Sequence, residues 1–173
     1  MDIKITEWLK KTRSLLPINL GRILDIGSLN VNGSAREVYT SDEYIGIDLR
    51  EGKDVDRVMN AHDIAEEFGE ESFDLVVCMS TLEHDNCFWL TLGAINKVLK
   101  RGGYHVSCVP TFHFPIHRHP KDYWRMSEEA VREVIFNGYE TLALEEIFTK
   151  EVNGNSVNPV ICAIGKKEGG GGL

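Results

Sequence analysis

Arg22-Ile23-Leu24-Asp25-Ile26-Gly27-Ser28 is the most informative stretch of this chain, together with the later stretch Tyr44-Ile45-Gly46-Ile47-Asp48. Each is a short apolar run with an acidic residue at or near its end, and Asp48 follows Gly27 by 21 residues. In a parallel sheet both ends lie at the carboxyl edge, where open α/β folds bind nucleotides. A carboxylate at the second strand end accepts hydrogen bonds from ribose hydroxyls, so the pair predicts a nucleoside-containing ligand.

The rest of the chain alternates predicted strands with predicted helices. Apolar runs predict strands at 22–26, 44–48, 57–59, 73–79, 104–109, 141–148 and 159–164. Helical spacing predicts helices at 5–16, 63–68, 87–99 and 127–136, with a short one from Ser34. This alternation predicts an α/β fold with a doubly wound, Rossmann-like, mostly parallel seven-stranded sheet, an antiparallel C-terminal strand and helices on both faces. We expect one domain over 1–168 and a flexible tail over 169–173.

The composition is that of a soluble globular domain. The chain has 173 residues, of which 42% are hydrophobic and 27% charged, with a formal net charge of −8. That acidic balance disfavours a broad nucleic-acid interface, because such interfaces rest on neutralising phosphates. No apolar run is long enough to span a bilayer, and the start of the chain has no signal-peptide core. We therefore expect a cytoplasmic protein with no membrane partner.

The turn after the first strand argues against a dinucleotide. A pyrophosphate site has the pattern G-x-G-x-x-G, whose second glycine lets the phosphates approach the helix. Leu29 and Asn32 stand at the second and third glycine positions of this chain. Leu29 would crowd a pyrophosphate, so an NAD-dependent oxidoreductase is the weaker alternative. S-adenosylmethionine carries no phosphate and demands less of this turn.

Four segments carry a resemblance to a known family. They are Leu24-Asp25-Ile26-Gly27-Ser28, Tyr44-Ile45-Gly46-Ile47-Asp48, Asn60-Ala61-His62-Asp63, and residues 73–84 followed by Leu99-Lys100-Arg101-Gly102-Gly103. In order and spacing they resemble the class I S-adenosylmethionine-dependent methyltransferases. The last segment looks very like the small-molecule methyltransferases of the ubiquinone-biosynthesis type. The resemblance implies S-adenosyl-L-methionine as the cofactor of a methyltransferase.

The resemblance also implies where the cofactor binds. Asp48, with Leu49 beside it, would hold the ribose; the alternative for Asp48 is a helix N-cap or a solvated strand end. Asp25, Gly27 and Ser28 would form the loop at the methionine end, and the alternative there is a plain strand-to-helix turn.

Two further segments complete the implied cofactor site. Asp63, with His62 close by, would accept a hydrogen bond from the adenine amino group, or Asp63 would instead cap the helix that follows. Met79 and Ser80 end the predicted strand 73–79, and their backbone carbonyls would receive the cofactor's ammonium group.

Two histidines are candidate catalytic bases. His84 lies just past the strand 73–79, where it would face the methyl group, and His113 lies in a later loop. A neutral imidazole suits proton removal from a hydroxyl at physiological pH. The alternative for His84 is a helix first-turn residue or one that packs on the cofactor.

The long connection 110–126 predicts a substrate lid. It has no clear regular structure but carries aromatic and basic side chains, and such long connections are usually functional or disordered. We expect His117, Arg118, Tyr123 and Arg125 to bind the substrate. The histidines of this loop with Asp122 also suggest a metal site, but two prolines stiffen the loop, and we predict no metal.

The sequence leaves the acceptor open. We expect O- or N-methylation of a small polar molecule, a sugar or another metabolite, because the chain has no inserted domain to hold a larger substrate. The rival hypothesis is a non-catalytic protein that binds S-adenosylmethionine or another nucleoside. A homodimer is compatible with the short chain, since a partner subunit would complete the site.

Overall fold

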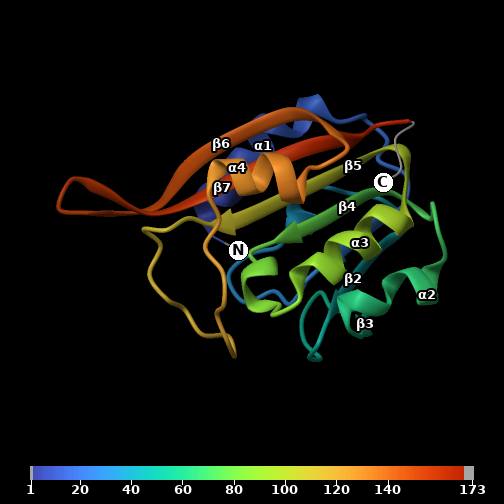
Figure 1. Ribbon diagram of the computed structural model, residues 1–173, viewed down its shortest axis with the longest axis horizontal. Coiled ribbons are helices and arrows are strands. Elements are labelled where there is room, and N and C mark those ends of the chain that lie inside the picture. Colours follow the sequence, from blue (N-terminus) through green and yellow to red (C-terminus); the bar gives the residue numbers. More distant parts are fainter. Residues whose placement is uncertain (1, 170–173) are drawn as a thin grey trace.

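A computed structural model describes residues 2–169 and arranges them around one seven-stranded sheet (Figure 1). The strand order is β3-β2-β1-β4-β5-β7-β6; the first five strands in this order run parallel, and β7 lies antiparallel to both β5 and β6. This confirms the predicted fold class. The strands are β1 Ile23–Ile26, β2 Tyr44–Asp48, β3 Arg57–Val58, β4 Phe73–Met79, β5 Leu99–Pro110, β6 Tyr139–Val152 and β7 Asn155–Lys167. The tail expected at 169–173 lies, apart from Gly169, outside the described residues.

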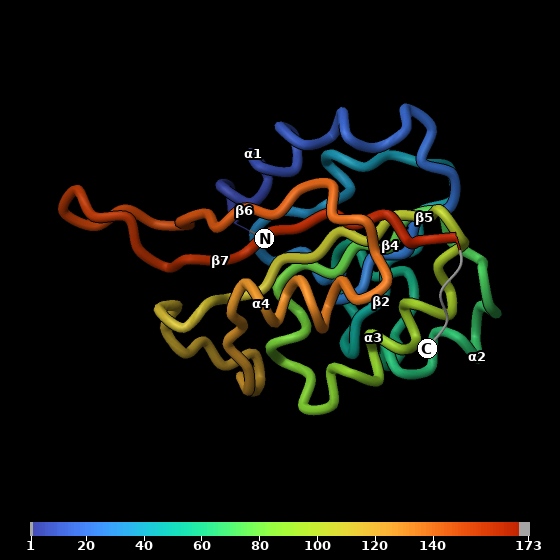
Figure 2. Tube along the Cα trace, turned by 45° about the horizontal axis from the view of Figure 1, so that its top comes forward, coloured from blue at the N-terminus to red at the C-terminus, as the bar shows by residue number. Residues whose placement is uncertain are grey.

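Helices cover the two faces of the sheet (Figure 2). The longer ones are α1 Ile3–Thr12, α2 Ile64–Phe68 and α3 Phe88–Val98, and α4 Glu128–Ala130 continues into a π-helical turn η5 Val131–Ile135. Short 3-10 turns are η1 Arg13–Leu15, η2 Ala35–Glu37, η3 Ala61–Asp63 and η4 Leu82–His84. Within residues 2–169 no helix is long and apolar enough to cross a membrane.

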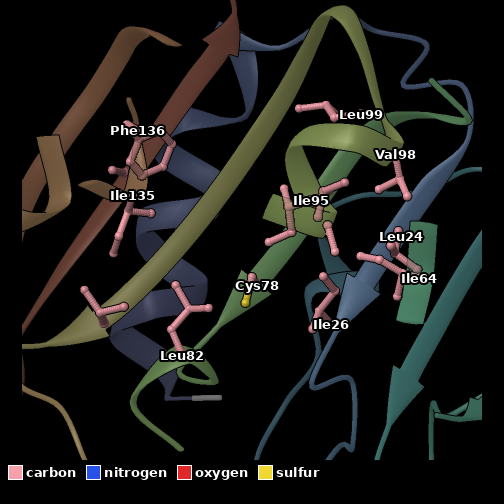
Figure 3. Packing of buried hydrophobic residues seen from close by; sticks show 14 of the residues in the cluster. Leu24, Ile26, Ile64, Cys78, Leu82, Ile95, Val98, Leu99, Ile135 and Phe136 are labelled. Atoms are coloured by element: carbon pink, nitrogen blue, oxygen red, sulfur yellow. The ribbon is translucent and has the colours of Figure 1, made fainter. Parts of the chain in front are cut away.

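The core has two halves, one on each face, because successive side chains of a strand point to opposite sides. Leu24 and Ile26 of β1 belong to the same buried cluster as Ile64 of α2, Ile95 of α3 and Ile135 of η5 (Figure 3). Ile23 packs instead with Trp8 and Leu9 of α1. The central strands are therefore buried on both faces, which explains their nearly continuous apolar sequence.

The C-terminal hairpin is longer than the sequence predicted. β6 and β7 extend well beyond 141–148 and 159–164, to a turn at Asn153 and Gly154. Both turn residues have positive φ, 52° and 76°, as a two-residue hairpin turn requires. The outer residues are mostly exposed and polar, so they lack an apolar pattern although their backbones pair. Figures 1 and 2 show this hairpin projecting beyond the rest of the sheet.

Gly27 and Thr81 join the ends of the two central strands. Thr81 Oγ1 donates to the carbonyls of Ile26 and Met79, at 3.2 and 3.1 Å, and so links the ends of β1 and β4. Gly27 has φ +75°, and a Cβ placed on it would lie 2.1 Å from that hydroxyl oxygen. Only glycine permits both this backbone conformation and this approach.

We predict that Gly27→Ala destabilises the protein more than Gly154→Ala does. The two glycines have nearly equal φ, but a Cβ on Gly154 meets nothing within 4 Å. Gly154→Ala should therefore carry only the left-handed backbone cost of about 1–2 kcal/mol, whereas Gly27→Ala adds overpacking of about 1–3 kcal/mol. Urea unfolding of both variants measures the difference, and equal losses would contradict the role given to the Thr81 contact.

Candidate functional site

The candidate site lies at the carboxyl edge of the parallel strands. Ile26 of β1 pairs in register with Ile47 of β2 and with Cys78 of β4, so the next residues of all three strands meet at one edge. The strand order reverses between β1 and β4, because the chain continues outward from β1 to β2 and from β4 to β5. Open α/β sheets bind ligands in the crevice at such a switch point.

Asp48 stands at this edge with a free carboxylate oxygen. Its Oδ1 accepts from the backbone N–H of Arg50 at 3.1 Å, and among residues 2–169 its Oδ2 accepts no hydrogen bond. No helix begins at Asp48, so it is a strand end rather than an N-cap. Leu49 beside it is 68% exposed. The pair thus offers an acceptor and an apolar surface next to each other.

The loop after β1 is tied to the loop after β2. The backbone N–H of Asn30 donates to the carbonyl of Lys53 at 3.0 Å, and its side-chain amide donates to Asp54 at 2.7 Å. The side chain of Leu29 lies directly over Gly52, where a Cβ would meet it at 2.2 Å. The residue that breaks the dinucleotide pattern therefore packs between the two loops. Ser28 Oγ is buried nearby and has no hydrogen-bond partner among the described residues.

Asp25 supports these loops from inside the sheet. It is 4% exposed and accepts a hydrogen bond from the Tyr44 hydroxyl at 2.7 Å. The Arg36 guanidinium lies 4.3 Å from the centre of the Tyr44 ring and pairs with Asp56. Burial raises the pKa of Asp25 to about 7 despite the hydrogen bond from Tyr44. Its binding of the cofactor stays a prediction, as does that of Gly27 and Ser28.

In the segment before α2, the residue predicted to bind adenine does not cap the helix with its side chain. Asn60, not Asp63, makes the capping bond, since its side chain accepts from the backbone N–H of His62 at 3.0 Å. Asp63 is exposed and its carboxylate makes no capping hydrogen bond. His62 Nε2 lies 2.9 Å from Asp85 and so joins this segment to the loop after β4. That Asp63 accepts a hydrogen bond from the adenine amino group stays a prediction, and its carboxylate is exposed for this role.

β4 ends in a bend at Met79 and Ser80. Ser80 has φ +50°, and its backbone N–H donates to the Cys108 carbonyl at 2.9 Å. The Met79 carbonyl already receives the Thr81 hydroxyl. The bend turns the chain away from the sheet at the switch point, where both predicted residues remain candidates for binding the cofactor.

A cluster that the sequence did not predict lies just beyond this bend. Glu83, His84 and His117 bring their side chains together; His84 belongs to η4 and His117 to the connection 110–126. Glu83 Oε1 lies 3.8 Å from His84 Nε2 and 3.6 Å from His117 Nε2. The Glu83 carboxyl raises the pKa of His117. Glu83 was missed as a functional residue, although its position next to His84 was a usable signal.

The connection 110–126 is ordered by its own side chains. Arg125 makes a two-pronged ion pair with Asp122, at 2.5 and 2.7 Å, and donates to the carbonyls of Phe114 and Pro115. This pairing holds the pKa of Asp122 well below its usual range. Arg125 therefore braces the loop, and its substrate contact stays a prediction.

The same connection is docked on the loop after β4. The backbone N–H of Tyr123 donates to the Glu83 carbonyl, and Trp124 Nε1 donates to the Asp85 carbonyl, both at 2.8 Å. Trp124 packs on Phe88, as a core residue would. His113 and Arg118 are exposed, and Tyr123 is 43% exposed. The catalytic role of His113 and the substrate contacts of Arg118 and Tyr123 stay predictions.

A wide hollow exists at the opposite end of the sheet. Its lining includes Arg22, Asp74 and Lys100, which lie around the amino ends of β1 and β4. An ion pair of 2.9 Å between Lys100 and Asp74 accounts for two of these side chains. Because this end is remote from the carboxyl edge, the hollow is not part of the candidate site.

Comparison with known proteins connects this geometry to a family. Residues 24–107 match the family model for a methyltransferase domain. A search of curated proteins finds no match. Among solved structures, the chain is similar to an S-adenosylmethionine-dependent methyltransferase from Archaeoglobus fulgidus, with 16% identity, 94% of each chain covered and a TM-score of 0.68. It is also similar to 1,6-didemethyltoxoflavin-N1-methyltransferase from Burkholderia thailandensis, with 14% identity, 92% of this chain and 78% of that chain covered, and a TM-score of 0.69.

At these identities the solved structures establish the fold, and the family match supplies the class. The matched residues run from β1 into β5 and include Asp25, Asp48 and Glu83. Residues 24–107 therefore match a methyltransferase domain, and the chain has the fold of class I methyltransferases, as the sequence resemblance predicted. The similar solved structures include S-adenosylmethionine-dependent enzymes, one of them with S-adenosylhomocysteine bound.

We predict that the wild-type protein loses stability as the pH rises and that the Asp25→Asn variant does not show this loss. Asp25 in the folded protein keeps its proton up to a pKa of about 7, whereas an unfolded aspartate loses it near about 3.9. Because the folded state binds the extra proton, stability falls as pH rises between these values and levels off above the folded pKa. Asparagine cannot ionise and still accepts from Tyr44.

Thermal melts from pH 4.5 to 8 check this expectation. The wild type should lose stability relative to Asp25→Asn across that range, while Asp42→Asn, at an exposed position, should follow the wild type. Parallel profiles for the wild type and Asp25→Asn would contradict the buried protonated carboxyl.

Proposed function

We propose that this protein transfers the methyl group of S-adenosylmethionine to an oxygen or nitrogen of a small polar molecule, such as a sugar or another metabolite. The observation that carries the proposal is the polar cluster of Glu83, His84 and His117 next to the switch point. It stands beside the end of β4, where a bound cofactor would present its methyl group, and the connection 110–126 supplies its third member, His117.

Residues at the carboxyl edge fit the cofactor. Asp48 has an oxygen free to accept from the ribose, and Leu49 gives the adenine an apolar surface. Asp63 is exposed for the adenine amino group, and the buried, unpartnered Ser28 Oγ is available at the methionine side. Ser80 and Met79 would receive the ammonium. When bound, S-adenosylmethionine supplies an electrophilic methyl carbon on a cationic sulfur.

His84 is oriented to take a proton from the acceptor. Its Nδ1 faces the backbone carbonyl of Lys121 and so donates to it, because a carbonyl only accepts. That bond fixes the tautomer whose Nε2 carries a lone pair. A hydroxyl acceptor placed against Nε2 would lose its proton there as it attacks, whereas an amine with a free lone pair needs no base before attack.

The connection 110–126 limits the size of the acceptor. It is braced by Arg125 and Asp122 and docked on Glu83, so it covers the cluster as a fixed wall. His117, Arg118 and Tyr123 would donate to a polar acceptor from this wall, and His113 is the outer candidate base. Holding the reactants in line contributes up to roughly 7–11 kcal/mol to such a reaction. The structure of the Burkholderia enzyme contains 1,6-didemethyltoxoflavin with S-adenosylhomocysteine.

Calorimetry with S-adenosylhomocysteine tests the cofactor half of the proposal. We predict that Asp48→Ala weakens binding at least tenfold, since each hydrogen bond to a charged group contributes about 1.5–3 kcal/mol. Asp42→Ala, which removes an exposed carboxylate before β2, should bind as the wild type does. Equal affinity of Asp48→Ala and the wild type would contradict the ribose site.

A screen of acceptors with labelled methyl donor tests the transfer half. On a hydroxyl acceptor we predict that His84→Ala lowers kcat by about 10²–10⁴, the usual worth of a general base. Unchanged turnover in both His84→Ala and His113→Ala would eliminate the base. Tight binding of S-adenosylhomocysteine with no methylation of any acceptor would support the non-catalytic rival.

A further inference from the structure

Glu83, His84 and His117 have the composition and spacing of a metal-ligand set. One atom from each side chain, a carboxylate oxygen and two imidazole nitrogens, lies within 4.8 Å of the others. A transition-metal ion holds such atoms at about 2.0–2.2 Å, so neighbouring ligands lie roughly 3–3.5 Å apart. The separations of 3.6 and 3.8 Å from Glu83 Oε1 to the two Nε2 atoms need only a small contraction.

The second ring nitrogen of each histidine lies near an acceptor oxygen, as is common in metal sites. Metal-ligating histidines commonly donate their other ring N–H to a carbonyl or a carboxylate, which orients the ring and fixes the tautomer. His84 Nδ1 faces the carbonyl of Lys121. His117 Nδ1 lies 3.2 Å from Asp122 Oδ2 without the geometry of a hydrogen bond, and the backbone N–H of His117 donates to the same oxygen at 2.7 Å. The Nε2 atoms of both rings lie on the side of Glu83.

Glu83 supplies an independent indication of a missing cation. Its side chain is 1% exposed, and neither of its oxygens has a hydrogen-bond partner among the described residues. A buried carboxylate without hydrogen bonds is costly unless a cation or a proton accompanies it. The two imidazoles remain 17% and 28% exposed, so an ion can reach the cluster from solvent.

We propose that Glu83, His84 and His117 bind a divalent transition-metal ion, with Zn²⁺ as the best match. Two histidines and one carboxylate bind Zn²⁺ or related ions and leave coordination positions open. Asp122 is an outer partner that orients His117, not a ligand. Of the loop residues that the sequence suggested as ligands, His117 alone belongs to the set.

A bound ion would favour an acceptor with a hydroxyl group over other small polar molecules. In a part of the inference that rests on the proposed function, a hydroxyl of the acceptor occupies an open position of the ion. With the ion bound, His84 Nε2 would be a ligand and not the base, and the ion would take over that role: it would lower the pKa of the hydroxyl, whose proton would leave to solvent. Transfer then forms the oxygen–carbon bond and breaks the carbon–sulfur bond. Ion binding itself does not depend on methyl transfer.

Titration of the purified, tag-free protein with Zn²⁺ and with Co²⁺ tests the site. We expect one ion per chain by calorimetry and a visible absorption band from bound Co²⁺. Glu83→Gln, His84→Ala and His117→Ala should each weaken binding more than tenfold, and Asp122→Asn should weaken it by about 10–100-fold, as outer-partner changes do. His119→Ala, an exposed histidine of the same loop, should bind like the wild type.

Two results would overturn the site. One is the absence of ion binding to the wild type, which would leave Glu83 and His117 as an ion pair. The other is ion binding that survives both Glu83→Gln and His117→Ala. S-adenosylhomocysteine binding, measured on the same samples, separates this proposal from the proposed function, because either can fail while the other holds. Circular dichroism of Glu83→Gln, which keeps the side-chain shape, verifies folding.

Discussion

The contact between Thr81 and Gly27 is the constraint on which the site depends. The hydroxyl of Thr81 spans the ends of β1 and β4 by bonding to carbonyls of both strands, and glycine at position 27 makes room for it. These two strands flank the point where the sheet order reverses. The loops that carry Asp48, Ser80 and the Glu83 cluster all leave the sheet close to this junction, so its geometry sets theirs.

The loop after β1 differs in structure from the corresponding loop of a dinucleotide-binding fold. A glycine at position 29 would let phosphates approach the chain. Here Leu29 fills the space over Gly52, while Asn30 bonds to Lys53 and Asp54, so side chains join the two loops. A cofactor without phosphates does not need the space that Leu29 takes. The same residue thus explains both the broken pattern and the packing of the two loops against each other.

The sequence predicted the features that depend on local pattern. Strand periodicity located β1, β2 and β4, and strand ends located Asp48, because both follow from neighbours in the chain. The cluster of Glu83 with His117 could not be predicted, since the two residues are far apart in sequence and meet through an irregular connection. The structural role of Arg125 could not be predicted for the same reason. A guanidinium near aromatic residues can bind a ligand, but it can equally donate to carbonyl groups of its own loop, as Arg125 does. The full length of the β6–β7 hairpin was not predicted from the sequence, because its outer residues pair through their backbones and show no apolar pattern.

We expect the nucleoside to bind at the carboxyl edge between β1 and β4, with its ribose on Asp48. A crystal structure of the protein with S-adenosylhomocysteine tests this most directly. We predict both ribose hydroxyls within hydrogen-bond distance of the Asp48 carboxylate, and the sulfur on the side of Ser80 that faces His84. A nucleoside bound elsewhere, or a ribose without contact to Asp48, would contradict it.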